Sequence, residues 1–354
     1  MAKKRRSILP IDNLPGLFDG LEIDLTRKDL AGDLIARHRE EARNLAAELD
    51  RNSAQGDMLS GITPRPASAT ERLMFISLGS GSSGNCAYLG NSSEGILIDA
   101  GIDPDRIKSE LKINGIDYKG IQGIILTHDH SDHVRFAYQL LRKQKQMMLY
   151  TTPRTLSGLL RRHSISSRIK DYHKPIYKEH PFEIGLFRIT PFDTSHDGTD
   201  NVGFHISYGE YHSFVVMTDS GCITDRSDFY IRQARYLMIE SNYDAHMLAE
   251  GSYPEFLKAR IASDRGHMDN RITAEYLAKA YSPTLTHIFL CHLSHDNNTP
   301  ELAIAESRKA LENAGISVGD ASGSIEARKA QVQLYALPRF DSSTLFVFRE
   351  SNQI

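Results

Sequence analysis

This sequence contains little cysteine and no long apolar run. Only three cysteines occur among 354 residues, too few for a disulfide framework, so the sequence favours a reducing compartment and predicts a cytoplasmic protein. No stretch of about 18 apolar residues exists, which excludes a membrane-spanning helix. The basic N-terminus is not followed by an apolar segment, so we expect no secretory signal. What remains is a globular protein of ordinary composition, 40% hydrophobic and 25% charged.

The formal net charge of −3 conceals one strongly basic segment. Between residues 135 and 178, eleven Lys or Arg stand against a single acid, Asp171, which is a net of +10. A concentration of positive charge of this size attracts polyanions, and nucleic acid is the usual one. The segment therefore predicts a nucleic-acid partner, with a solvated basic face that has no partner as the alternative.

The first 70 residues differ from the rest of the chain. Thr26 can cap an amphipathic helix over 26–50, whose apolar residues recur at helical spacing. Residues 51–70 are rich in Gly, Ser, Pro and Ala and predict a linker. We therefore expect an N-terminal arm over 1–70. Its helix can pack on the main domain, on a second copy of the chain or on a partner protein.

Residues 71–354 show short apolar strands that end in polar turns, with helical periodicity between some of them, which indicates one layered α/β domain. The predicted strands are Leu73–Leu78, Cys86–Leu89, Ile96–Ile98, Ile124–Leu126, Met148–Thr151, Phe187–Thr190, Val202–Tyr208, Phe214–Thr218, Tyr236–Ile239, Ile288–Leu290, Val332–Leu337 and Leu345–Phe348. The predicted helices are His133–Gln144, Thr155–Arg162, Ile272–Tyr281 and Pro300–Ala314.

A run of metal-ligand side chains follows the apolar segment 123–127. It reads Thr-His-Asp-His-Ser-Asp-His and contains His128, His130, Asp132 and His133. Alternate residues of an extended segment point the same way, so His128 and His130 can share one cation. Asp132 and His133 stand where a helix would begin, on the other side of the loop. Four ligands within six residues can serve two adjacent cations, which predicts a metal-dependent hydrolase.

Three more candidate ligands, His196, Asp219 and His292, also follow predicted strands. Taken singly, an aspartate or histidine at a strand end is most often a turn residue. Together they favour a site, because aligned strand ends are where α/β folds assemble their binding and catalytic groups.

The order of these motifs resembles the metallo-β-lactamase superfamily over about residues 73–354. Asp99-Ala-Gly comes first, then His-x-His-x-Asp-His, and then His196, Asp219 and His292 in turn. Further motifs resemble its YycJ (WalJ)-like branch, namely Gly79-Ser80-Gly81-Ser82-Ser83-Gly84-Asn85-Cys86, Glu240-Ser241-Asn242 and His292-Leu293-Ser294. The resemblance implies an αββα four-layer sandwich and DNA exonuclease activity.

The resemblance also divides the candidate ligands into two sets, each for one cation: His128, His130 and His196, and Asp132, His133 and His292. Asp219 would bridge the two cations, and a hydroxide between them would attack the phosphodiester. Asp132 is also expected among the catalytic groups, and Asp99 is expected to orient a ligand histidine. Zinc suits these ligands best, with manganese or iron as alternatives.

Other residues are expected to contact the substrate. His267, in Gly266-His267-Met268, corresponds by its order to a proton donor of related tRNA-processing ribonucleases, with a histidine at a helix start as the alternative. Ser82, Ser83 and Asn85 in the glycine-rich loop can bind phosphate, and so can His295. An ordinary turn and a surface histidine would have the same sequence.

The function predicted from these residues is a metal-dependent phosphodiesterase that hydrolyses nucleic acid, DNA by the resemblance, from a strand end. One alternative is a hydrolase of a small ester, such as a cyclic phosphodiester or a thioester, although such a substrate does not require the basic segment. The other alternative is a metal-stabilised binding protein without activity, which the complete ligand set disfavours.

Overall fold

The computed structural model describes residues 72–320 and 324–349. The predicted N-terminal arm, with its helix over 26–50 and its linker over 51–70, lies outside the described residues. No helix within the described ranges has the length and apolar character needed to span a bilayer.

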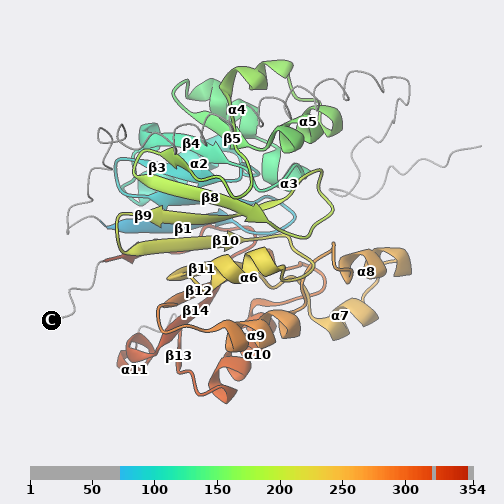
Figure 1. Cartoon of the computed structure of the whole chain (residues 1–354). Helices are drawn as coiled ribbons and strands as arrows, with labels where there is room; N and C mark the ends of the chain where they lie inside the picture. The colour runs from blue at the N-terminus through green and yellow to red at the C-terminus, as the bar shows by residue number, and fades with distance from the viewer. Residues whose placement is uncertain (1–71, 321–323, 350–354) are drawn as a thin grey trace, which may run out of the picture. The chain divides into compact units, whose positions relative to one another are not determined.

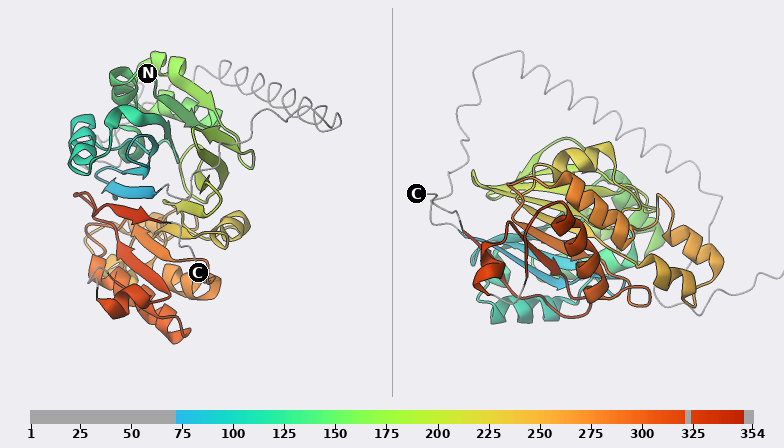
Figure 2. Two further views of the ribbon diagram at one scale, coloured as in Figure 1. Left: turned by 90° about the vertical axis from the view of Figure 1, so that its left-hand side faces the viewer. Right: turned by 90° about the horizontal axis from the view of Figure 1, so that it is seen from below.

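Two mixed sheets form the centre of the domain (Figure 1). The first has the spatial order β15 (Phe346–Phe348), β1 (Leu73–Gly79), β2 (Cys86–Gly90), β3 (Gly95–Ile98), β4 (Ile121–Ile125), β5 (Met148–Thr151) and β6 (His173–Pro175). The second has the order β13 (Val318–Gly319), β14 (Val332–Ala336), β12 (His287–Cys291), β11 (Tyr236–Glu240), β10 (His212–Met217), β9 (Val202–Tyr208), β8 (Phe187–Asp193) and β7 (Phe182–Ile184). Figure 2 shows β1 beside β15, so the first and last described strands share a sheet.

Helices cover the outer face of each sheet. The first sheet packs against α2 (Pro104–Ile113), α4 (Ala137–Lys143) and α5 (Pro153–Arg162) through one buried apolar cluster. The second packs against α6 (Asp225–Ile231), α9 (Asn270–Ala280) and α10 (Pro300–Asn313) through another. A third cluster, rich in phenylalanine, lies between the sheets and includes Phe75, Phe214 and Phe289. The expected αββα four-layer sandwich is therefore confirmed.

Parallel pairing brings several strand ends to the same edge. In the first sheet β3 and β4 are parallel, with Ile98 opposite Ile125. In the second sheet β10, β11 and β12 are parallel. Because parallel strands end on the same side, the loops that follow them converge at one edge of each sheet. The candidate ligands occupy these loops.

The prediction of one helix over 133–144 is wrong in one respect. The structure has two helices in this region, α3 (Ser131–Val134) and α4. The Ala100 backbone explains the break, since its N–H donates to the carbonyl of His133 and its carbonyl accepts from the N–H of Phe136. These two bonds tie the segment to the loop after β3 at the point where an uninterrupted helix would have continued. They also fix the position of His133.

Candidate metal centre

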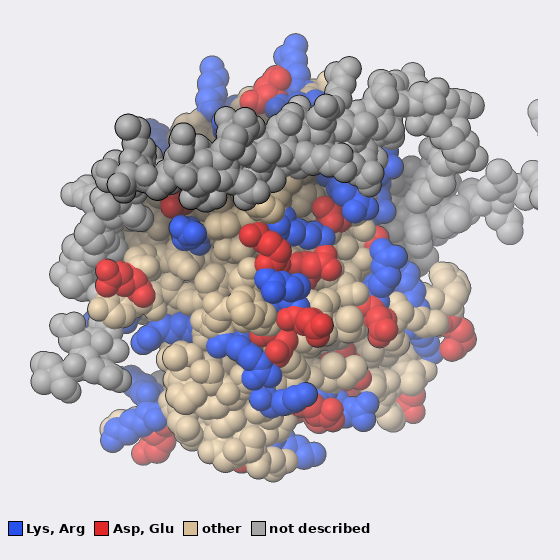
Figure 3. All heavy atoms as spheres, viewed as in Figure 1, with Lys and Arg blue, Asp and Glu red and all other residues tan. Residues whose placement is uncertain are grey.

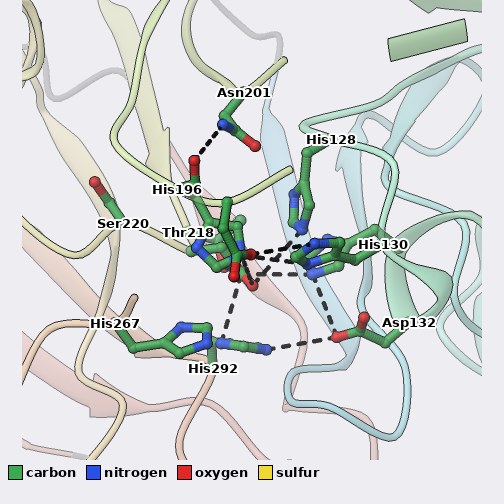
Figure 4. A network of polar contacts seen from close by, with 12 residues as sticks. His128, His130, Asp132, His196, Asn201, Thr218, Ser220, His267 and His292 are labelled. Atoms are coloured by element: carbon green, nitrogen blue, oxygen red, sulfur yellow. Dashed lines mark hydrogen bonds and ion pairs between the residues drawn. The ribbon is translucent and has the colours of Figure 1, made fainter. Parts of the chain in front are cut away.

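Each candidate ligand comes from a loop or helix start that directly follows a strand. Asp99 follows β3, His128 to His133 follow β4, and Asp219 and His292 follow β10 and β12. Asp99, Asp219 and His292 have positive φ angles of 61°, 44° and 54°, a region that residues with a Cβ adopt only when their surroundings hold them there. The chain thus turns sharply at three strand ends, and Figure 4 shows the side chain of His292 pointing toward the other candidate ligands.

The first set of ligands brings three imidazoles together. One ring nitrogen from each of His128, His130 and His196 lies within 4.8 Å of the other two. The closest pair is Nδ1 of His130 and Nε2 of His196, at 3.2 Å. Three nitrogens at this spacing can surround a single cation, as in a three-histidine zinc site.

The second set brings together Asp132, His133 and His292, again with donor atoms within 4.8 Å of one another. Oδ2 of Asp132 lies 3.4 Å from Nε2 of His133 and 3.6 Å from Nε2 of His292. A carboxylate oxygen between two imidazole nitrogens also suits a transition-metal cation.

Asp219 lies between the two sets, with a different oxygen toward each. Oδ2 is 3.8 Å from Nε2 of His128 and 3.7 Å from Nε2 of His196. Oδ1 is 3.4 Å from Nε2 of His133 and 3.5 Å from Nδ1 of His292. One buried carboxylate can therefore contribute one oxygen to a cation in each set.

The donor atoms fit a bound cation. Nε2 of His128 and Nε2 of His292 are buried and have no hydrogen-bond partner among the described residues. A buried polar atom without a partner is costly in an apolar interior, and a metal ion would satisfy both of these nitrogens. The chemistry of the set, imidazole with carboxylate, suits divalent metals such as zinc.

Burial and neighbouring charge divide the histidines by protonation. Burial lowers the pKa of His196 to about 4 and holds that of His128 well below its usual value, so both rings are in the neutral form that binds a metal. Burial also opposes the charged form of His292, but Asp219, Asp132 and Glu240 raise its pKa to about 10. A cation that binds beside His292 must therefore displace a proton.

Hydrogen bonds fix the orientation of the rings. Nδ1 of His133 lies 2.7 Å from Oδ2 of Asp99, whose carboxylate also accepts from the backbone and hydroxyl of Thr127. Nδ1 of His196 lies 2.9 Å from the carbonyl of Gly266. With each Nδ1 engaged, Nε2 is the nitrogen left to face the centre.

We expect Asp99→Asn to weaken cation binding at the set that contains His133 by about 10- to 100-fold. The neutral amide has one acceptor oxygen where the carboxylate has two, so it accepts the Nδ1–H of His133 more weakly and holds the ring less firmly. Chelator competition, titrated on the full chain, measures the affinity. The set with His128, His130 and His196 is linked to Asp99 only through the Thr127 hydroxyl, which contacts Nδ1 of His128, and should lose less affinity. Equal loss at both sets would contradict the expected role.

Glu240, which the sequence analysis did not select as a site residue, stands at the end of β11 and is fully buried. Its Oε1 lies 2.7 Å from Nδ1 of His267 and 2.9 Å from Nδ1 of His292. Its Oε2 accepts from the backbone N–H groups of Ser220 and Met268. Glu240 thus joins a candidate ligand to the candidate proton donor, and its strand-end position was the signal that could have identified it.

Two further aspartates support the loops. Asp129, buried inside the histidine run, accepts from the backbone and hydroxyl of Thr199 and so ties this run to the loop that carries His196. Asp197 has Oδ1 3.3 Å from Nε2 of His130, while its Oδ2 pairs with Arg260 of α8 (Glu255–Ile261). Neither was predicted from the sequence.

The four residues expected to bind phosphate lie in different surroundings. Ser82 is exposed and Ser83 is half-buried, both in the loop between β1 and β2. The side chain of His295 is 62% exposed, and its Nδ1 lies 2.8 Å from Oδ1 of Asp296. Asn85 is buried, and its amide donates to Asp132 and accepts from the N–H of Gly81. Its hydrogen bonds are thus already made inside the protein, and they hold Asp132.

The layered fold and the cluster at the strand ends are those of the metallo-β-lactamase type. A family profile described as a beta-lactamase superfamily domain matches residues 95–288. The chain is 33% identical over 250 residues to an exodeoxyribonuclease YycJ from Bacillus anthracis, a match that covers 70% of this chain and 93% of that one. It is 34% identical over 248 residues to an exodeoxyribonuclease WalJ from Streptococcus pneumoniae, covering 68% and 89% respectively.

Among solved structures, the metallo-β-lactamase fold protein YhfI from Bacillus subtilis matches with a TM-score of 0.55 and 16% identity, covering 78% of this chain and all of that one. At this identity the match shows the fold alone. Together with the family profile and the YycJ and WalJ relatives, it shows that the chain belongs to the metallo-β-lactamase superfamily, in its YycJ (WalJ)-like branch.

Proposed function

We propose that this protein is a metal-dependent phosphodiesterase that degrades DNA from a strand end, with two divalent cations, preferably zinc, held by the seven residues of the centre. The observation that carries the proposal is the position of Asp219, whose two oxygens face two separate sets of ligands. Such a centre can clamp the attacking and leaving oxygens of a phosphodiester.

The basic segment and the relatives support a DNA substrate. Ten of the eleven Lys and Arg between 135 and 178 are exposed. Some of the charge is offset, since Lys143 pairs with Asp105 and Lys178 with Asp193 and Asp200. On the face drawn in Figure 3 blue and red side chains are mixed. The choice of DNA rests on the names of the relatives, which are exodeoxyribonucleases.

Bound cations would supply an activated water and neutralise charge on the phosphate. The chain's own residues do the rest. Asp99 and Gly266 hold the ligand rings in orientation, and Asn85 holds Asp132. Glu240 accepts from Nδ1 of His267, which leaves Nε2 as the nitrogen from which a proton can pass to the leaving oxygen. Figure 4 shows His267 beside His292, at the edge of the cluster.

Metal analysis combined with nuclease assays tests this function. We expect about two cations per chain, and stepwise loss of nucleotides from end-labelled DNA that slows as salt rises. Parallel assays on single- and double-stranded DNA and RNA identify the substrate, and His128→Ala should lose activity together with metal. Cleavage of a cyclic phosphodiester or thioester, without cleavage of nucleic acid, would replace this proposal with the small-ester alternative. A partner for residues 26–50 and a cytoplasmic location stay predictions from the sequence.

A further inference from the structure

An exposed aromatic side chain stands beside the candidate metal centre without a role in it. Phe340 is 53% exposed, in the segment that follows β14. Its ring lies 5.9 Å from the ring of His295 in an edge-on arrangement. The guanidinium of Arg339 lies over the same ring, 5.2 Å from its centre. An exposed aromatic ring beside an arginine offers a face on which a nucleic-acid base can stack.

Arg339 is anchored at one end of its guanidinium and only weakly bonded at the other. Nη1 donates to the carbonyl of Leu293 at 3.1 Å. Nη2 donates to the hydroxyl of Ser82 at 3.4 Å, which is long for such a bond. Nε is buried and has no partner among the described residues. Nη2 is therefore the donor with spare capacity, and it lies beside the exposed Ser82, whose hydroxyl is a second donor for a phosphate oxygen.

Backbone contacts join this group of residues to the centre. Leu293, which accepts from Arg339, directly follows His292. The backbone N–H of Ser80 donates to the carbonyl of Pro338, while the hydroxyl of Ser80 accepts from the N–H of His292. A Cβ on Gly81 would lie only 2.9 Å from Cγ of Arg339, so the glycine lets the arginine approach the loop. Ser80 and Leu293 thus connect the segment 338–340 to the candidate ligand His292.

We propose that Phe340, Arg339 and Ser82 form a subsite for one nucleotide of the substrate, next to the phosphodiester that is cleaved. The base stacks on Phe340, and the phosphate accepts hydrogen bonds from Arg339 and Ser82. This inference rests on the proposed function and deepens it, because it assigns the group that grips the strand beside the centre. Stacking on an aromatic face does not depend on which base is present, as degradation of any sequence requires.

Charges of both signs surround the patch. Asp341 directly follows Phe340 and is exposed. Asp296, which follows His295, is engaged by Nδ1 of His295 at 2.8 Å and by the hydroxyl of Tyr253 at 2.6 Å. Arg135, the first residue of the basic segment, reaches the same loop, with Nη1 3.5 Å from the carbonyl of Ser83. The glycine-rich loop thus lies between Arg339 and Arg135, so a strand that crosses it meets positive charge on both sides.

The test compares Phe340→Ala with the wild-type chain on short single-stranded DNA that is either intact or lacks one base near the end. Binding is measured by fluorescence anisotropy in chelator, and KM and kcat are measured with metal present. We expect Phe340→Ala to weaken binding to intact DNA by about 5- to 150-fold, the range for loss of one stacked base. The effect should fall on KM more than on kcat, with metal content unchanged, and Phe340→Tyr should restore binding.

The DNA that lacks a base separates stacking from other effects. If Phe340 stacks on a base, the wild-type chain loses the same factor when that base is missing, and Phe340→Ala then loses nothing more. Phe229→Ala is the matched control, because Phe229 is 51% exposed and lies beneath Arg226 in the same way, but on α6. It should behave as wild type.

Two outcomes would overturn the subsite, and they differ in what else they affect. If the wild-type protein degrades DNA, but Phe340→Ala and Phe229→Ala have the same small effect on binding and KM with every substrate, the subsite is wrong and the proposed function stands. If wild-type protein neither binds nor degrades nucleic acid, both are wrong. Arg339→Lys adds a check on the phosphate contact, since it keeps the charge but loses the fork, and it should weaken binding to DNA with and without the base equally.

Discussion

Asp219→Asn is expected to prevent the two cations from binding together and to lower turnover by more than about 100-fold. Loss of a group that only orients a ligand costs at most about 100-fold, and Asp219 is proposed to bind both cations directly. The reason lies in the two oxygens. Oδ2 faces His128 and His196, and Oδ1 faces His133 and His292, so this one carboxylate serves both sets. An amide of the same shape cannot bring a negative oxygen to each. The variant should therefore bind fewer than two cations per chain.

Thermal unfolding with and without chelator distinguishes this effect from damage to the fold. Burial opposes the charged form of Asp219, but the positive charges of His292 and His133 hold the pKa of its carboxyl well below the usual value. The metal-free variant should thus be less stable by itself. The decisive quantity is the rise in melting temperature when metal is added. Metal at a free concentration 1,000 times its Kd stabilises the folded state by about 4 kcal/mol. The wild-type chain should show this gain and Asp219→Asn should show little of it.

Asp193→Asn is the matched control for that experiment. Asp193 also ends a strand, β8, but its carboxylate pairs with Lys178 and its side chain is 55% exposed. It should keep the cations, the gain in melting temperature and the turnover of the wild-type chain. If Asp219→Asn did the same, Asp219 would not be a bridging ligand, and the two-cation centre would have lost its main support.

The strands of the sandwich were predictable because their signal is local. Twelve apolar segments were expected, and each contains or overlaps a strand of the structure. Strands that are buried on both faces, such as β3 and β11, show nearly continuous apolar runs in the sequence and are hard to mistake. The missing strands β6, β7 and β13 are two or three residues long, too short for a pattern to appear.

The helices were harder to predict, because several bury very little. Within α7 (Ala245–Glu250) Leu248 alone is buried, and within α8 Leu257 alone, so neither shows helical periodicity. α2 is a different case. Asp103 caps it and Pro104 begins it, and both signals were present in the sequence. The break between α3 and α4 depends on bonds to Ala100, more than thirty residues earlier, which no local pattern reveals.

The same distinction applies to the centre. The residues that stand at strand ends in ligand-type motifs were selected from the sequence, and the structure brings their donor atoms together. Glu240, Asp197 and Asp129 were not selected, because their roles are defined by what they contact. Glu240 is a strand-end acid like Asp219, but only the parallel pairing of β10, β11 and β12 brings it under both His267 and His292.

His267→Ala is expected to lower kcat on DNA by about 10²- to 10⁴-fold, the usual contribution of a positioned acid, while metal content stays that of the wild-type chain. Its ring is 5.2 Å from that of His292 and 5.0 Å from that of His196, close enough to serve the same substrate. Its Nδ1 is held by Glu240. Glu240→Gln should differ from it, because Oε1 also contacts His292, so this variant should lose turnover and metal affinity together.

The leaving group decides whether the lost function is proton donation. A nitrophenolate leaves without needing a proton, so the defect of His267→Ala should largely disappear on bis-nitrophenyl phosphate and persist on DNA. A histidine that only shaped the site would slow both substrates alike, and that result would refute the donor role. His246→Ala is the control, since His246 is also beside a glutamate, Glu250, but is 78% exposed on α7. A loss of metal in His267→Ala would instead make His267 a ligand, with Glu240 orienting it as Asp99 orients His133.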